Sequence, residues 1–281
     1  MSELRIGVLG TGRIGSMHAE LIARRVSGAR LARIFDVDRD AAGVAAGLSV
    51  PISETAEELI GASDVDAVAI CTSTDTHVAM IEAAAAAGKP IFCEKPVSFE
   101  LGLVDRALAA VEQAGVPLMI GFNRRFDPAH ASVRHAVAAG VIGDVHLVRI
   151  SSRDPGPPPI AYIHVSGGIF LDMTIHDFDM ARFVTGSEVV EVFACGTVRI
   201  SPEIGEAGDL DTAVVTLVHA DGTLTVIDNS RQAVYGFDQR VETFGSKGVA
   251  SSENPLNHTG VTRTAAGTTG PSLPHFFLER Y

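Results

Sequence analysis

The chain has 281 residues, which is enough for one large domain or two ordinary ones. Its residues are 46% hydrophobic and 20% charged, the composition of a soluble globular protein with a substantial core. The net charge of −12 argues against binding to nucleic acid or to a polyanionic membrane surface, because both require a basic face.

Residues 4–122 alternate strand-like and helix-like segments. Short apolar runs predict strands, and the longer segments between them predict helices. The expected strands are 4–10, 30–37, 66–73, 90–96 and 117–122, and the expected helices are 14–26, 80–87 and 99–114. Gly88 falls where a glycine that ends a helix is expected. This order predicts an α/β domain of the Rossmann type, with a parallel sheet and helices on both faces.

The pattern changes after Gly121, and we place the domain boundary there. A helix is expected over 128–139, followed by longer strands in which apolar residues alternate. Residues 211–230 and 239–252 each read as a hairpin, the first turning at Asp221-Gly222. The sequence therefore predicts an α/β domain with a parallel sheet over 1–122 and an α+β domain with a largely antiparallel sheet over 123–281.

The last nine residues, LPHFFLERY (273–281), resemble the opening turns of an amphipathic helix. No helix stop signal precedes the end of the chain. We therefore expect that the second domain is truncated at its C-terminus.

The segment GTGRIG follows the first expected strand and opens a helix. Its glycines allow the backbone to approach a pyrophosphate, whose charge then lies at a helix N-terminus. The candidate cofactor-binding residues of this loop are Gly10, Gly12, Arg13, Ile14 and Gly15. The alternative is that the glycines only permit tight packing.

Asp36 ends the second strand, at the distance from the glycine loop that dinucleotide-binding proteins use. A carboxylate there accepts hydrogen bonds from both ribose hydroxyls and repels a 2′-phosphate, which favours NAD over NADP. The alternative is a helix cap or a solvated turn residue.

Two more parallel strands end in polar residues, at the sheet edge where ligands of such folds bind. After the first come Thr72, Ser73 and Thr74, candidates for the nicotinamide ribose, and His77, a candidate cofactor contact or cap of the next helix. The alternative is ordinary polarity at a helix start.

Glu94 and Lys95 follow the next strand, and both are expected to project into the cofactor crevice. The sharp exit at Lys95-Pro96 is compatible with a cis peptide bond. Lys95 can donate to substrate hydroxyls and stabilise negative charge. The alternative is a solvated loop lysine.

Asp172 and His176 stand four residues apart within SGGIFLDMTIHDFDMARF, and on a helix they share one face. A histidine is a suitable base for an alcohol proton, and the carboxylate can orient the substrate and stabilise the imidazolium. Asp177 and Asp179 lie on other faces, where they could pair with Arg182 or cap neighbouring segments. The alternatives for the Asp172–His176 pair are a buried structural hydrogen bond or a metal site, but a metal needs further ligands that the sequence does not supply.

The cysteines Cys71, Cys93 and Cys195 are odd in number and lack metal-type spacing, which favours a reducing compartment. The N-terminal residues do not read as a signal peptide, and no apolar run is long enough to span a bilayer. We therefore expect a cytoplasmic protein.

Taken in order, GTGRIG, EKP and GGIFLDMTIHDFD resemble the Gfo/Idh/MocA oxidoreductase family over nearly the whole chain. The glycine loop is generic, but the combination of Lys95, Asp172 and His176 is specific to this family. Three further stretches, GFNRRFDP (121–128), SRDPGPPP (152–159) and SRQAVYGFDQRVETFGSKG (230–248), are most similar to members that oxidise inositols.

The resemblance implies that Lys95, Asp172 and His176 form the catalytic set. It implies NAD-dependent oxidation of a cyclitol, myo-inositol or a related inositol, to the ketone by hydride transfer, with His176 as general base. The implied substrate pocket also contains Arg125, Asp154 and Tyr235. Members are usually homotetramers that pair through the open face of the C-terminal sheet. The resemblance therefore implies that residues 1–122 form a Rossmann NAD-binding domain and that residues 123–281 form a domain for substrate binding and oligomerisation.

Two other functions stay open. One is an NAD(P)-dependent sugar dehydrogenase of the same family, because residue spacing does not separate hydroxyl-rich rings of similar size. The other is a non-catalytic NAD-sensing regulator on the same fold. A sensor has no use for a proton acceptor, so the presence of the whole catalytic set argues against it.

Overall fold

The chain forms two compact units, Met1–Phe122 and Asn123–Tyr281. The structure is a computed structural model, and it describes residues 3–38, 47–276 and 280. Among these described residues, no helix combines the length and the apolar character needed to cross a membrane.

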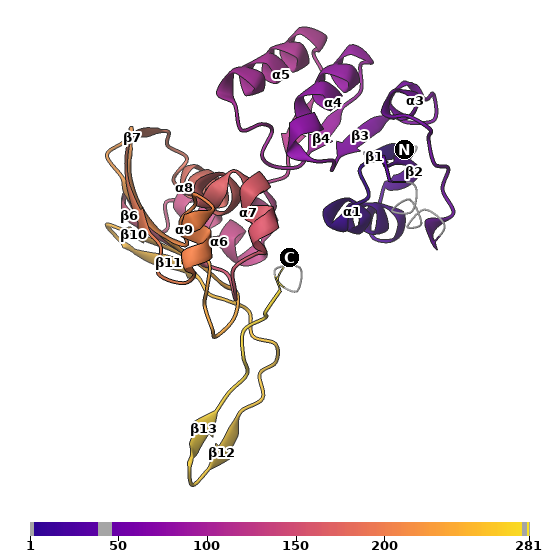
Figure 1. The fold of residues 1–281 in the computed structure, drawn as a ribbon. Helices are drawn as coiled ribbons and strands as arrows, with labels where there is room; N and C mark the ends of the chain where they lie inside the picture. The colour runs from indigo at the N-terminus through magenta and orange to yellow at the C-terminus, as the bar shows by residue number, and fades with distance from the viewer. Residues whose placement is uncertain (1–2, 39–46, 277–279, 281) are drawn as a thin grey trace. The chain divides into compact units, whose positions relative to one another are not determined.

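A five-stranded parallel sheet in the order β2-β1-β3-β4-β5 forms the centre of the first unit (Figure 1). The strands are β1 (Leu4–Leu9), β2 (Ala29–Phe35), β3 (Ala67–Ile70), β4 (Ile91–Cys93) and β5 (Leu118–Ile120). The helices within the described part are α1 (Arg13–Arg24), α3 (Ala56–Gly61), α4 (Thr74–Ala86) and α5 (Leu101–Ala114). Gly88 follows α4 with a φ of +69°, as expected for a glycine that ends a helix.

Helices cover both faces of this sheet. The neighbouring strand residues Val8 and Leu9 point to opposite faces and belong to different apolar clusters. Leu9 packs with residues of α4 and α5, such as Ile81 and Val111, whereas Val8 packs with Ala19 of α1. The predicted α/β fold class is therefore confirmed.

The strand order reverses at β1, because β2 lies on one side of it and β3 on the other. Ligands of doubly wound sheets bind beyond the carboxyl ends of the strands at such a point. The glycine loop follows β1, and Thr72 follows β3. A Cβ atom added to Gly10 would lie 2.7 Å from backbone atoms of Cys71 and Thr72, so the two loops are in contact.

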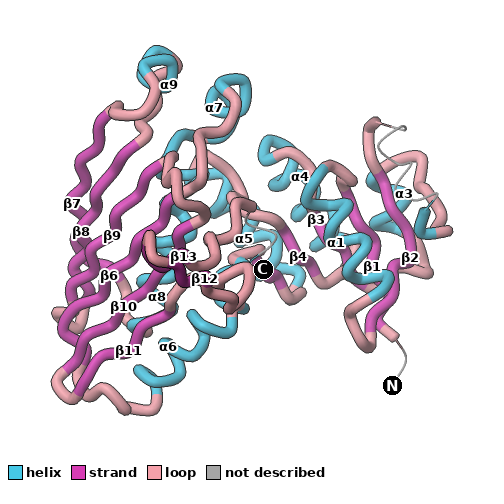
Figure 2. Tube along the Cα trace, turned by 90° about the horizontal axis from the view of Figure 1, so that it is seen from below, coloured by secondary structure: helices cyan, strands magenta, loops and turns pink. Residues whose placement is uncertain are grey.

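The second unit is built on a six-stranded sheet in the order β11-β10-β6-β9-β8-β7 (Figure 2). Its strands are β6 (Val145–Arg153), β7 (Val189–Thr197), β8 (Thr212–His219), β9 (Leu224–Ser230), β10 (Asp238–Gly245) and β11 (Gly248–Ser252). The helical elements are η1 (Asn123–Phe126), α6 (Pro128–Ala138), α7 (Ile160–Ser166), η2 (Phe170–Thr174), α8 (Ile175–Thr185) and α9 (Pro202–Glu206). Both predicted hairpins are present, as β8–β9 and β10–β11.

One face of this sheet carries the core of the unit. Val215, Leu217 and Ile227 pack there against α6 and α8, through residues such as Val133 and Met180. The sheet is largely antiparallel, as predicted, but β6 and β9 run parallel. This pairing joins residues about 80 positions apart, so neither hairpin reveals it.

A small hairpin of β12 (Thr262–Thr264) and β13 (Gly267–Thr269) extends away from the sheet of the second unit (Figure 1). All residues of these two strands are exposed. Residues 273–276, the start of the helix expected over 273–281, are not helical. Residues 277–279 and 281 of that segment lie outside the described residues.

Candidate active site

The glycine loop has the geometry that a pyrophosphate needs. A Cβ atom on Gly15 would lie 1.9 Å from the Gly10 carbonyl oxygen, so a glycine is required where α1 packs on the loop. At Gly12 an added Cβ would meet no atom of the described residues within 4 Å. Among the described residues, no side chain caps the N-terminus of α1, whose cap residue is Gly12. The first turn therefore presents N–H groups beside open space, which fits the phosphates of NAD.

Asp36 lies directly beside this loop. Its Oδ2 accepts hydrogen bonds from the Thr11 backbone N–H at 2.5 Å and from the Thr11 hydroxyl at 3.0 Å. Its Oδ1 accepts from the Asp38 N–H at 2.9 Å, which is a local turn contact. The carboxylate is thus held at the end of β2 by the glycine loop, where binding of a ribose is expected.

The residues after β3 open α4. Ser73 is the exposed cap residue, Thr74 is half-buried, and the Thr76 hydroxyl donates to the Thr72 hydroxyl at 2.6 Å. His77 is only 1% exposed, and both its ring nitrogens lie within 3.0 Å of protein carbonyl oxygens. This geometry contradicts the prediction that His77 contacts the cofactor directly, because the ring is buried and both of its nitrogens contact carbonyl oxygens of the protein.

Glu94 and Lys95 follow β4, and both are half-buried. The Lys95-Pro96 peptide bond is cis. Glu94 Oε1 lies 2.7 Å from His18 Nε2 on α1. Gly121 leaves room for this carboxylate, because a Cβ there would lie 3.0 Å from Glu94 Oε2.

Asp172 and His176 belong to the second unit, where the helix begins differently from the prediction. Residues Phe170–Thr174 form a π-helical turn, and α8 begins only at Ile175. The expected α-helical spacing of Asp172 and His176 is therefore interrupted by a wider turn, a feature that often occurs at functional sites. Both side chains are half-buried.

The Asp172 carboxylate is held from two other segments. Its Oδ1 accepts from the Tyr162 hydroxyl at 2.8 Å, and its Oδ2 lies 3.3 Å from Arg231 Nη1. The Arg231 side chain is 1% exposed and also reaches Asp209 Oδ2 at 3.0 Å. Asp209 Oδ1 in turn accepts from the Ile169 N–H at 2.9 Å, at the start of the turn that carries Asp172.

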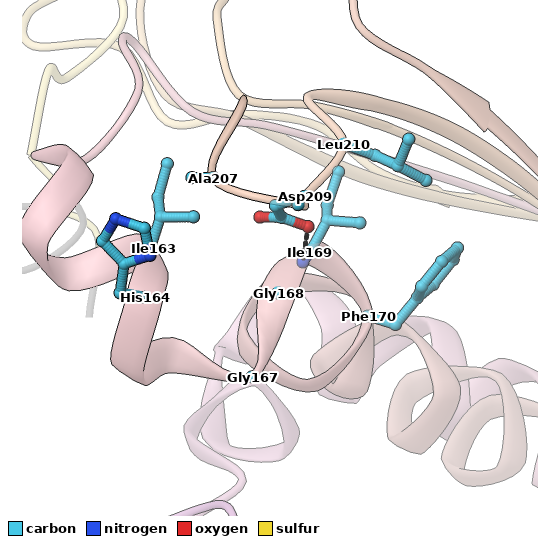
Figure 3. A pocket seen from close by; sticks show the side chains of 10 residues that line it. Ile163, His164, Gly167, Gly168, Ile169, Phe170, Ala207, Asp209 and Leu210 are labelled. Atoms are coloured by element: carbon cyan, nitrogen blue, oxygen red, sulfur yellow. Dashed lines mark hydrogen bonds between the residues drawn. The ribbon is translucent and has the colours of Figure 1, made fainter. Parts of the chain in front are cut away.

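A cavity of about 400 Å³ lies between Gly167–Phe170 and Ala207–Leu210 (Figure 3). Asp209 and His164 contribute its polar side chains. Figure 3 shows the Asp209 carboxylate bonded to the backbone of the Ile169 turn. Asp209 thus lines the cavity and also binds Arg231, which in turn contacts Asp172.

Asp177 and Asp179 form structural pairs rather than the contacts expected with Arg182. Asp177 is fully buried and bonds Arg124, Ser152 and Asn229. Asp179 binds Arg125 through both guanidinium nitrogens Nε and Nη2. Arg182 instead pairs with Glu188, at 2.7 and 2.8 Å. The expected pairing with Arg182 was wrong, because these partners come from segments distant in sequence, whereas Glu188 lies just beyond the end of α8.

The candidate pocket residues Arg125, Asp154 and Tyr235 all lie in the second unit. The Arg125 guanidinium is fixed by Asp179 and lies 5.3 Å from the centre of the Phe183 ring. Asp154 follows β6, and burial raises the pKa of its carboxyl to about 6, with the nearby charge of Arg124 opposing the shift and that of Asp172 adding to it.

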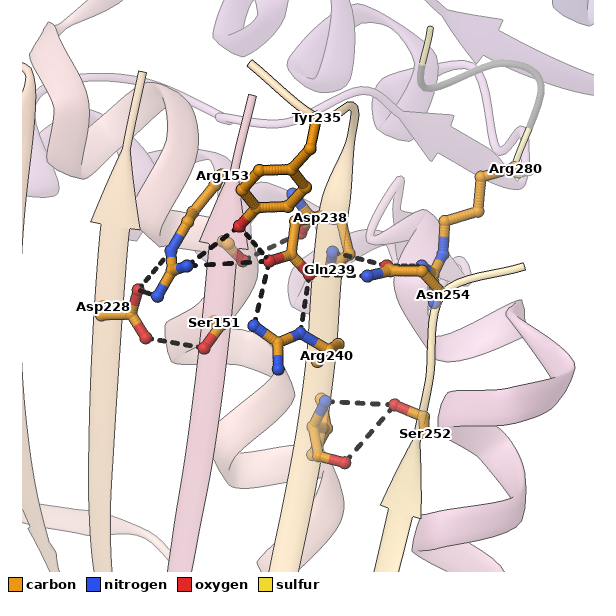
Figure 4. Close-up of polar contacts among 12 residues, drawn as sticks. Ser151, Arg153, Asp228, Tyr235, Asp238, Gln239, Arg240, Ser252, Asn254 and Arg280 are labelled. Carbon is orange, nitrogen blue, oxygen red and sulfur yellow. Dashed lines mark hydrogen bonds and ion pairs between the residues drawn. The ribbon is translucent and has the colours of Figure 1, made fainter. Parts of the chain in front are cut away.

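Tyr235 belongs to a polar network at the ends of β6, β9 and β10 (Figure 4). Its hydroxyl donates to Asp238 Oδ2 at 2.7 Å and accepts from Arg153 Nη1 at 3.0 Å. Arg153 also binds Asp228, at 2.7 Å. Burial is the largest influence on Asp238 and opposes ionisation, but hydrogen bonds from Arg240, Tyr235 and Asn254 hold the pKa of its carboxyl below the usual range. Tyr235 is therefore held by an ionised partner.

Sequence reasoning missed several residues that hold the site, notably Arg231, Tyr162 and Arg124. Arg231 and Arg124 sit within the quoted stretches 230–248 and 121–128, but a charged loop residue usually signals solvent exposure. The excess of carboxylates around positions 172–179 could have indicated that buried arginines pair with them, since buried carboxylates require cations.

Known proteins resemble the whole chain. The family model described as "Oxidoreductase family, NAD-binding Rossmann fold" matches residues 4–122, and the GFO/IDH/MocA C-terminal domain matches 130–251. The protein called myo-inositol 2-dehydrogenase of Thermotoga maritima is 51% identical over 285 residues, covering 99% of this chain and 84% of the relative. The inositol 2-dehydrogenase of Rhizobium meliloti is 48% identical over 278 residues, with the same two coverages of 99% and 84%.

Solved structures agree with these matches. A probable dehydrogenase from Thermotoga maritima has a TM-score of 0.96 at 52% identity, covering 99% of this chain and 84% of the other. Scyllo-inositol dehydrogenase from Lactobacillus casei, with bound NAD(H) and scyllo-inositol, has a TM-score of 0.89 at 30% identity, again covering 99% and 84%. The predicted fold and the NAD cofactor are thereby confirmed, and the chain belongs to the GFO/IDH/MocA family of NAD-binding oxidoreductases.

Proposed function

We propose that this protein oxidises an inositol to the corresponding ketone with NAD as the acceptor. The observation that carries the proposal is the 51% identity to a myo-inositol 2-dehydrogenase over 99% of this chain. The retention of Lys95, Asp172 and His176 at the family motif positions supports a catalytic rather than a sensing role.

Each member of the proposed catalytic set has one task. His176 takes the proton from the reacting hydroxyl, Lys95 donates a hydrogen bond to the reacting or adjacent oxygen, and Asp172 orients a neighbouring hydroxyl and the imidazole. The bound nicotinamide supplies the acceptor for the hydride. Arg231 and Tyr162 support this assignment of Asp172, because they hold its carboxylate in one orientation.

The cofactor-binding set in this proposal comprises Gly10, Gly12, Arg13, Ile14 and Gly15 of the glycine loop, Asp36, the residues Thr72–Thr74, Glu94 and Lys95. The open space at Gly12 and the contact of Asp36 with Thr11 support it. The substrate set comprises Lys95, Arg125, Asp154, Asp172, His176 and Tyr235.

We further propose a cytoplasmic homotetramer. The face of the second sheet opposite the buried Val215 carries Phe193, Val214, Phe244 and Val249, which are 42–61% exposed. Apolar side chains gathered on one open face are typical of a protein interface. All three cysteines are free thiols, which agrees with a reducing compartment. Light scattering after size-exclusion chromatography measures the assembly, and a monomer would contradict this part of the proposal.

A substrate panel tests the function. The protein is mixed with NAD⁺ and with each of several inositol isomers, aldoses and anhydrosugars, and NADH formation is followed by absorbance. We expect turnover on myo-inositol or scyllo-inositol to exceed turnover on every sugar. A preference for an aldose would instead indicate a sugar dehydrogenase, and NAD binding without turnover on any polyol would indicate a sensor.

A further inference from the structure

His77 joins two loops at the cofactor edge of the first unit. Its Nδ1 lies 2.8 Å from the carbonyl oxygen of Pro96, in the loop after β4. Its Nε2 lies 3.0 Å from the carbonyl oxygen of Thr72, in the loop after β3. The side chain is 1% exposed, so water does not compete for either contact.

The two contacts use different atoms of one ring. Both oxygens belong to carbonyl groups, which only accept hydrogen bonds. A neutral imidazole carries one N–H and donates to one of them, whereas the protonated ring donates to both. The ring therefore lies between the two loops: Nδ1 faces the carbonyl oxygen of Pro96, the residue next to Lys95, and Nε2 faces that of Thr72.

The other side of Lys95 is also fixed. The Glu94 carboxylate lies 2.7 Å from His18 Nε2 on α1, and its Oε2 accepts from the Lys95 backbone N–H at 3.3 Å. The His18 ring packs edge-on against Phe92, with 5.1 Å between the ring centres. The backbone on both sides of Lys95 is thus tied to a helix, α1 before it and α4 after it.

We propose that His77 is a positioning residue with two separable effects. Through Nδ1 it sets the backbone from which Lys95 reaches the substrate, and through Nε2 it sets the Thr72 loop beside the cofactor. This inference rests on the proposed role of Lys95. In this proposal, His77 contacts neither NAD nor the substrate.

Two conservative variants separate the effects. The side-chain nitrogen of Asn is separated from Cα by the same number of bonds as Nδ1 of His. The side-chain nitrogen of Gln is separated from Cα by the same number of bonds as Nε2 of His. His77→Asn therefore retains the Pro96 contact and loses the Thr72 contact, and His77→Gln does the reverse. We expect H77Q to lower kcat on the order of 10-fold with the Kd for NAD nearly unchanged. We expect H77N to raise the Kd for NAD several-fold, with kcat within about threefold of wild type.

The measurements are steady-state kinetics on myo-inositol and titration calorimetry with NAD⁺, on variants whose thermal unfolding shows them to be folded. A lower kcat in H77Q but not in H77N, together with a higher Kd for NAD in H77N but not in H77Q, supports the proposal. Equal effects of both variants on both parameters, or no effect of either, would overturn it. If neither variant folds, ¹⁵N-histidine spectra of the wild-type protein decide: a slowly exchanging His77 ring proton is expected, and a freely exchanging ring contradicts the proposal.

The Lys95→Met background distinguishes this inference from the proposed function. If His77 acts on turnover through Lys95, H77Q lowers kcat in the wild-type background and lowers it no further in K95M. An additional loss in K95M would show that His77 acts by another route. A K95M variant with wild-type turnover would instead remove Lys95 from the proposed mechanism, whatever the His77 variants do.

Discussion

Arg231 Nη1 lies 3.3 Å from Asp172 Oδ2, and this contact links the proposed catalytic carboxylate to a buried cation. The same guanidinium binds Asp209, whose other oxygen holds the Ile169 backbone. Arg231 therefore fixes both the Asp172 side chain and the turn on which it stands. A buried cation that pairs with two carboxylates is costly to remove, because its loss leaves both of them without this positive charge.

Replacing Arg231 with Met is expected to lower the free energy of unfolding by about 3–5 kcal/mol. Arg182→Met is a matched control, because Arg182 pairs with Glu188 at the surface, where the side chains are 48% and 70% exposed. That variant should lose about 1 kcal/mol or less. Urea unfolding measures both. Equal losses would show that burial of the Arg231 pair contributes little.

Asp154 gives the protein a pH-dependent stability. Its pKa is about 6 in the folded chain and about 4 when unfolded. Between these values the folded carboxyl holds a proton that the unfolded one has released. The Asp154 contribution to the free energy of unfolding is therefore full below about pH 4 and is lost as the pH rises to about 6.

Asp154→Asn should remove this slope and make the protein more stable at pH 7, by about 1–3 kcal/mol. Urea unfolding at several values of pH measures the difference from wild type. Asp105→Asn, at an exposed position on α5, is the control and should keep the wild-type pH dependence. A difference between D154N and wild type that does not change with pH would contradict the raised pKa.

The glycine loop allows cofactor binding to be separated from folding. Gly12→Ala adds a methyl group where no atom of the part of the chain that the structure describes lies within 4 Å, so the thermal unfolding temperature should not change. The methyl group would project into the space proposed for the pyrophosphate, and we expect the Kd for NAD to rise at least 10-fold, about 1.4 kcal/mol. Calorimetry with NAD⁺ measures it.

Gly15→Ala is the contrasting variant, because its Cβ would lie 1.9 Å from the Gly10 carbonyl oxygen. It should destabilise the protein through the packing of α1. If G12A bound NAD as tightly as wild type, the pyrophosphate would have to lie elsewhere.

The parts that sequence alone could predict are those with a local signal. Alternating apolar runs gave the parallel sheet of the first unit, and Asp221-Gly222 gave the β8–β9 hairpin. The cis bond at Lys95-Pro96 and the glycine after α4 are also local effects of residue type.

The remaining features depend on contacts between distant segments. Arg231 and Asp172 are separated by 59 positions, and nothing near either residue shows that they pair. The parallel alignment of β6 with β9 and the π-helical turn at Phe170–Thr174 are likewise set by the packing of the second unit. His77 was misassigned for the same reason, since its partner Pro96 lies beyond β4.

The proposed general base gives the most direct test of the chemistry. His176→Ala should lower turnover on the preferred inositol by about 10²–10⁴-fold, because the hydroxyl proton then has no positioned acceptor. The Kd for NAD should change little, since His176 belongs to the second unit and the glycine loop to the first. His164→Ala is the matched control: His164 is an exposed histidine on α7 of the same unit, and its loss should leave turnover near the wild-type value. If H176A turned over as fast as H164A, another group would have to accept the proton.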